Sequence, residues 1–139
     1  MSMTPRQVAI VQSTFRSVQP MGTTAAELFY ERLFQIEPTA SALFKGDLKQ
    51  QGRRFMQVLA VAVGGLSSMS TLVPIIQQLG ARHASYGVRA EHYDAVRQAL
   101  LWTLALILQD GYTAEVRAAW ATAYAMLAGV MKEAAWGVP

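Results

Sequence analysis

Apolar residues recur along this chain at spacings of three and four positions, which places them on one face of an α-helix. Thr4 and Gln7 form a capping box in front of the first such run, with Pro5 at the first helical position. The run stops at Gln19 and Pro20. We therefore expect a first amphipathic helix with an apolar face of Val8, Val11, Phe15 and Val18.

A second apolar stripe ends before a turn-rich segment, residues 38–44. Thr24 and Glu27 have the spacing of another capping box, so we expect the second helix to begin at Thr24. Asp47 follows the turn-rich segment and is expected to cap the third helix. Tyr30 should point inward, because it belongs to the stripe of Ala26, Phe29, Tyr30, Leu33 and Phe34.

Two further helices are predicted up to Gly87, separated by a loop over residues 67–71. Residues 58–63 would also suit a strand, but the helical period extends back to Gln51 and the neighbouring elements are helical, which favours the helix. Gly64-Gly65 closes the earlier helix. The apolar face of the earlier helix consists of Gln51, Phe55, Val58, Leu59 and Ala62. The apolar face of the later helix consists of Leu72, Ile76, Leu79, His83 and Tyr86.

The last two predicted helices meet between Asp110 and Thr113, where Asp110-Gly111 ends one and Thr113 caps the next. Six main helices and no secure strand predict an all-α class, and the absence of repeats and linkers predicts one domain over residues 1–139. The apolar face of the fifth helix consists of Tyr93, Val96, Leu100, Leu104 and Ile107. The apolar face of the sixth helix consists of Val116, Trp120, Tyr124, Leu127 and Met131.

Composition narrows the classes of function. The 139 residues include no cysteine, which excludes disulfides, iron–sulfur clusters and thiol catalysis and favours a reducing cytoplasm. The net charge is +3, but the basic residues are scattered, so nucleic acid is not an expected partner. No signal peptide is visible in Met1–Gln7, and glycine, serine and proline interrupt the uncharged stretch 55–81, which argues against a membrane span.

Catalytic motifs for hydrolases, kinases and metalloproteases are not recognisable. His83 lies in an apolar stripe and must satisfy two ring nitrogens; it could be a core histidine bonded to a carbonyl or a tyrosine, or a metal or haem ligand. Tyr30 and Gln51 are polar groups on two other apolar faces, and each alone could be an ordinary structural residue. Together the three suit an apolar pocket that holds a planar cofactor.

The combination of these residues resembles the bacterial single-domain globins and the globin domain of flavohaemoglobins. The resemblance covers the chain in order: a tyrosine in the second helix, a phenylalanine after the turn, a glutamine in the third helix and a histidine in the fourth. It is carried by the segments Leu28–Phe34, Pro38–Phe44, Leu79–Val88, His92-Tyr93 and Ala119–Tyr124. It implies a globin fold, a sandwich of three helices on three around a haem pocket.

The resemblance also implies roles for individual residues. His83 would ligate the iron of haem b on the proximal side, while Tyr30 and Gln51 would donate hydrogen bonds to the iron-bound ligand. No histidine is expected on the distal side, because His92 follows His83 by nine residues and belongs with the proximal elements. The pocket walls would be Phe44, Phe55, Val58, Leu59, Leu79, Val88, Tyr93 and Val96.

One departure from the family bears on mechanism. In flavohaemoglobins a tyrosine and a glutamate hold the proximal histidine; Tyr93 matches the tyrosine, but Ala135 aligns with the glutamate. Glu133 lies about 200° away around a helix and should face elsewhere. We therefore favour reversible binding of O2, CO and NO, for oxygen storage, transport or protection. The alternatives are a nitric oxide dioxygenase with a separate reductase and a haem-free interaction module or haem-based sensor.

Overall fold

Six α-helices joined by short turns make up residues 3–137, the part of the chain that this computed structural model describes. No strand occurs in this range, and residues 58–63 are helical, so the all-α prediction is confirmed. Within the same residues no helix is long and apolar enough to cross a membrane. Met1 and Ser2, the start of the segment searched for a signal peptide, lie outside the described residues. The elements are α1 Pro5–Val18, η1 Gln19–Met21, α2 Gly22–Ile36, η2 Pro38–Leu43, α3 Leu48–Gly65, α4 Met69–Ser85, α5 Ala90–Leu108, η3 Gln109–Gly111 and α6 Ala114–Trp136, where η denotes a short 3-10 helix.

Three of the four predicted helix caps are present. The Thr4 hydroxyl accepts a hydrogen bond from the Gln7 backbone N–H at 3.1 Å, and the Gln7 side chain accepts one from the Thr4 N–H at 3.0 Å. The Asp47 carboxylate starts α3, and the Thr113 hydroxyl starts α6 by accepting from the N–H of Val116 at 3.2 Å. These side chains satisfy N–H groups that a helix cannot pair internally.

The prediction of a cap at Thr24 is wrong. The chain passes from α1 through the single turn η1 directly into α2, which begins at Gly22 without a side-chain cap. The predicted loop 67–71 is also too long, because α4 already begins at Met69. Pro74 lies inside α4, where its missing N–H removes one hydrogen bond near the start of the helix without ending it.

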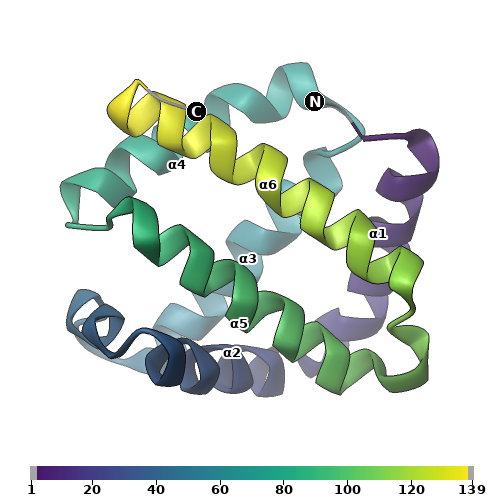
Figure 1. Cartoon of the computed structure of the whole chain (residues 1–139), viewed down its shortest axis with the longest axis horizontal. Coiled ribbons are helices and arrows are strands. Elements are labelled where there is room, and N and C mark those ends of the chain that lie inside the picture. Colours follow the sequence, from purple (N-terminus) through teal and green to yellow (C-terminus); the bar gives the residue numbers. More distant parts are fainter. Residues whose placement is uncertain (1–2, 138–139) are drawn as a thin grey trace.

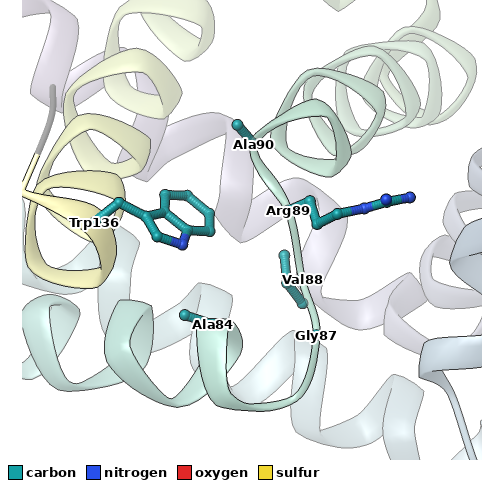
Figure 2. A pocket seen from close by; sticks show the side chains of 6 residues that line it. All are labelled: Ala84, Gly87, Val88, Arg89, Ala90 and Trp136. Atoms are coloured by element: carbon teal, nitrogen blue, oxygen red, sulfur yellow. The ribbon is translucent and has the colours of Figure 1, made fainter.

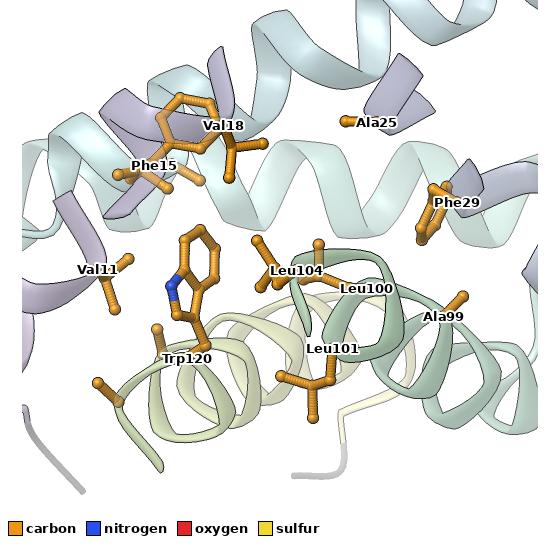
Figure 3. Packing of buried hydrophobic residues seen from close by; sticks show 14 of the residues in the cluster. Val11, Phe15, Val18, Ala25, Phe29, Ala99, Leu100, Leu101, Leu104 and Trp120 are labelled. Atoms are coloured by element: carbon orange, nitrogen blue, oxygen red, sulfur yellow. The ribbon is translucent and has the colours of Figure 1, made fainter. Parts of the chain in front are cut away.

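The core lies between paired helices. α4 packs along α6, and α2 packs along α5; α5 and α6 form an antiparallel pair that crosses in front of α3 (Figure 1). Trp120 sits in the centre of one cluster beside Phe15 and Leu104 (Figure 3), and its indole N–H donates to the Thr14 hydroxyl at 2.8 Å. This arrangement is the globin fold that the resemblance implies.

Two glycines allow close helix crossings that position the candidate site. A Cβ atom on Gly52 of α3 would lie 2.9 Å from the Ala26 Cβ of α2, and a Cβ on Gly80 of α4 would lie 2.4 Å from the Met131 carbonyl oxygen of α6. Such distances exclude any larger residue unless the helices separate. Gly80 lies one turn before His83, so this crossing fixes the position of the His83 turn along α6.

Candidate functional site

His83 lies on the last turn of α4, immediately before the chain turns at Gly87 with a φ of 96°. Its Nδ1 is 2.8 Å from the Leu79 carbonyl oxygen, and a carbonyl can only accept, so Nδ1 carries the proton and Nε2 keeps a free lone pair. Burial lowers the pKa of His83; the hydrogen bond to Leu79 opposes this, and the positive charge of Arg82 adds to it. The ring is therefore neutral near pH 7 and able to ligate a metal through Nε2.

A cleft of about 190 Å³ lies between α3 and α4. It brings together Val58 and Leu79, two of the predicted wall residues. Val58 is 41% exposed, because the two helices leave the cleft open along its side. Arg82 lines the same cleft and is its one cation among the lining residues. Sequence reasoning missed Arg82, although its place directly before His83 on the same helical turn was a usable signal.

Tyr30 of α2 is buried, as predicted, with 7% of its surface exposed. Its ring lies 4.9 Å from that of Phe44 and 6.2 Å from that of Phe55, measured between centroids, so two predicted wall residues surround it. The hydroxyl makes no hydrogen bond within residues 3–137. Burial raises the pKa of Tyr30 to about 12, which keeps the hydroxyl protonated and available as a donor.

Gln51 lies in the first turn of α3, and its side chain reaches the loop between η2 and α3. Its side-chain amide donates to the Lys45 carbonyl of that loop and is not paired with Tyr30. The backbone nevertheless holds Gln51 near α2, because the adjacent Gly52 packs on Ala26 and its missing Cβ would lie 3.7 Å from the Tyr30 ring. In this structure the loop carbonyl therefore holds the Gln51 amide.

The remaining predicted wall residues are divided between the core and the α4–α5 turn. Leu59 and Val96 are partly buried against the core. Val88 lines a second pocket, of about 560 Å³, across which Trp136 of α6 faces Val88 and Ala84 (Figure 2). Tyr93 is 5% exposed, and its buried hydroxyl has no hydrogen-bond partner among the described residues.

His92 and Tyr86 lie at the two ends of the α4–α5 turn. The His92 Nδ1 accepts a hydrogen bond from the Arg89 N–H at 2.9 Å and thereby caps α5. Tyr86 was predicted to continue the inward stripe of α4, but it is 68% exposed. It is the C-cap residue, so the helical period no longer governs its direction.

The donor set fits a haem better than a bare metal ion. Among the described residues no group of three or more His, Asp or Glu side chains could hold a metal ion. A single neutral imidazole with a free Nε2 can serve as the axial ligand of a haem iron. The hydroxyl of Tyr30, a residue that is 7% exposed, supplies a donor on another helix.

Comparison with known proteins agrees with this reading of the fold. The family model described as Globin matches residues 27–131. The chain is 32% identical over 133 residues to a flavohemoprotein of Bordetella parapertussis, covering 93% of this chain and 33% of that protein. It is 31% identical over 136 residues to a flavohemoprotein of Xylella fastidiosa, with 95% and 34% coverage, and 29% identical over 126 residues to one of Bacillus subtilis, with 88% and 32% coverage. The chain thus spans about a third of the length of these relatives. The protein is a member of the globin family.

Proposed function

We propose that this globin binds haem b through the Nε2 of His83 and that the bound haem supplies an iron that binds oxygen and other diatomic ligands reversibly. The observation that carries the proposal is the hydrogen bond of 2.8 Å between the His83 Nδ1 and the Leu79 carbonyl, which leaves Nε2 free. The relatives are called flavohemoproteins, a name that describes them as haem proteins, and this supports the proposal. The residues that would contact the haem are Phe44, Phe55, Val58, Leu59, Leu79, Val88, Tyr93 and Val96.

Arg82 extends this proposal to the carboxylates of haem b. It lines the α3–α4 cleft together with apolar side chains and belongs to the same helical turn as His83. A guanidinium at the rim of an apolar cleft binds a carboxylate while its neighbours exclude water from the ring. Arg82 would therefore hold the charged edge of the group and fix its rotation.

Tyr30 would retain the bound gas. Oxygen bound to ferrous iron carries partial negative charge, and a protonated hydroxyl in an apolar setting stabilises such a charge by about 1–3 kcal/mol. The hydroxyl is protonated because burial raises its pKa to about 12, and it need not break an existing hydrogen bond within residues 3–137 in order to donate. Gln51 would be the second donor after releasing Lys45.

The same pocket would also serve a nitric oxide dioxygenase that takes electrons from a separate reductase. We place reversible binding first because no carboxylate pairs with the Tyr93 hydroxyl in residues 3–137, and Glu133 is exposed. A histidine without such support donates less electron density to iron, which slows oxidative turnover. A single domain over residues 1–139 and a cytoplasmic location are further parts of the proposal.

Absorption spectra test it. The purified chain, supplied with hemin, should show ferric, ferrous and CO-bound spectra of a haem with one histidine ligand. A colourless chain after hemin is supplied would leave only the haem-free interaction module. Mixing the oxygen-bound form with NO in a stopped-flow instrument, with nitrate yield measured over many cycles in the presence of a reductase, separates the dioxygenase from the carrier.

A further inference from the structure

Five aromatic rings, Tyr30 among them, form one cluster that joins α2, the turn after η2 and α3. Measured between centroids, the Tyr30 ring lies 4.9 Å from that of Phe44 and 6.2 Å from that of Phe55. Within α2 it lies 5.4 Å from the ring of Phe29 and 6.0 Å from that of Phe34. We call Phe29, Tyr30, Phe34, Phe44 and Phe55 the Tyr30 cluster.

The closest pair of rings in the Tyr30 cluster is Phe29 with Phe55. Their centroids are 4.3 Å apart, and the angle between their planes is 12°, so the rings stack face to face. Phe29 is 2% exposed and belongs to the core cluster shown in Figure 3, whereas Phe55 is half-buried. One face of the Phe55 ring is therefore covered by Phe29, and Phe29 in turn is enclosed by the core.

The backbone also keeps Phe55 from moving toward α2. α3 crosses α2 at Gly52, where an added Cβ would lie 2.9 Å from the Ala26 Cβ. Gly52 precedes Phe55 by three residues, so the two lie on neighbouring positions of the same side of α3. Because even a methyl group does not fit at this crossing, the two helices are in close contact there. The Phe55 ring thus has no room to retreat toward α2.

We propose that the stack of Phe29 on Phe55 limits the size of the ligand that reaches the Tyr30 hydroxyl, with Phe29 acting as a positioning residue for Phe55. The proposal rests on the proposed function, in which this hydroxyl donates to an iron-bound ligand. O2, CO and NO bind without moving the Phe55 ring. A branched ligand has to displace the ring and break the stack, and so loses the stabilisation that an aromatic pair adds to its buried area.

Competition between a small and a branched ligand of the same chemistry tests the proposal. The probes are CO and tert-butyl isocyanide, which both bind ferrous haem through a carbon atom, and the readout is the ratio of their dissociation constants in the reduced, hemin-loaded protein. Phe29→Leu and Phe55→Leu each remove the stack but keep an apolar side chain. We expect the isocyanide to gain about three- to tenfold in affinity relative to CO in each variant, as loss of one aromatic pair allows.

Two other phenylalanines provide matched controls for the same substitution. Phe15→Leu removes a buried ring whose aromatic neighbour is Trp120, at 6.4 Å between centroids. Phe34→Leu removes a ring of the Tyr30 cluster whose aromatic neighbours are Tyr30 and Phe44. Both variants should have the wild-type ratio of dissociation constants, although both lose stability.

Urea unfolding of the haem-free chain tests the stack itself. The double variant Phe29→Leu with Phe55→Leu should lose less stability than the sum of the losses in the two single variants, because the second substitution has no stack left to remove. If Phe29→Leu does not fold, Phe55→Leu decides through the ratio of dissociation constants.

A ratio within twofold of wild type in either stack variant would overturn the proposal. An equal change in Phe15→Leu, or additive losses of stability in the double variant, would overturn it as well. A chain that does not bind hemin would instead overturn the proposed function, so the two failures are distinguishable.

Discussion

Replacing Tyr30 by phenylalanine isolates the hydroxyl that the proposed function depends on. The substitution removes one oxygen atom and keeps the ring that packs at 4.9 Å from Phe44 and at 5.4 Å from Phe29, measured between centroids. Because the hydroxyl has no partner within residues 3–137, its removal leaves no buried group without a hydrogen bond. We therefore expect the free energy of unfolding of the haem-free chain to stay the same or to rise.

The effect on bound oxygen should be large by comparison. Loss of a hydrogen bond to a partly charged ligand costs about 1–3 kcal/mol, which corresponds to an oxygen dissociation rate about 5- to 150-fold faster. CO carries less charge when bound, so its dissociation should change by less than about threefold. The difference should not vary between roughly pH 6 and pH 9, since a tyrosine with a pKa of about 12 does not titrate there.

Stopped-flow displacement of oxygen by CO measures this rate. Tyr112→Phe is a suitable control, because Tyr112 is a partly buried tyrosine in the turn between α5 and α6, away from α2. An oxygen dissociation rate in Tyr30→Phe within twofold of wild type would refute the role of the hydroxyl. The double variant Tyr30→Phe with Gln51→Leu then reports whether Gln51 has taken over the donation.

Three further predictions concern the scaffold. Gly80→Ala should lower the free energy of unfolding by about 1–3 kcal/mol in urea titrations, because of its clash with Met131, whereas Gly129→Ala, with open space around its Cβ, should be neutral or stabilising. Thr113→Ala should cost about 0.5–2 kcal/mol in the same assay, since it removes the cap of α6, and an unchanged midpoint would contradict that role. The folded-state pKa of His83 is lowered, so the haem-free chain should lose stability as the pH falls below about 6.5, where the unfolded chain protonates first. His83→Leu should flatten this dependence, and an equal slope in both proteins would contradict the assignment.

Much of the fold follows from local signals in the sequence. Thr4, Asp47 and Thr113 each precede a periodic apolar run and each caps a helix in the structure. Thr24 carries the same signal without that outcome, because η1 leads the chain into α2 two residues earlier and leaves no free helix end at Thr24. A capping motif predicts a helix start only where the preceding chain is not already helical.

The site was less predictable, because it depends on how helices cross. Tyr30 points inward as the periodic pattern predicts, and its ring lies beside that of Phe44. The exposure of Val58 depends on the separation of α3 and α4, and the place of Lys132 over Tyr93 depends on how α5 and α6 pack. Spacing along one helix carries no information on either distance. The resemblance to flavohaemoglobins identified the missing glutamate but not the lysine that lies near its place.

The visible spectrum of the hemin-loaded chain, compared between wild type and His83→Ala, tests the central claim most directly. We expect a ferrous and CO-bound spectrum of histidine-ligated haem in wild type, and loss of the pigment or of that ligation in the variant. A variant that retains the pigment with the wild-type spectrum would show that another residue holds the iron and would contradict the account.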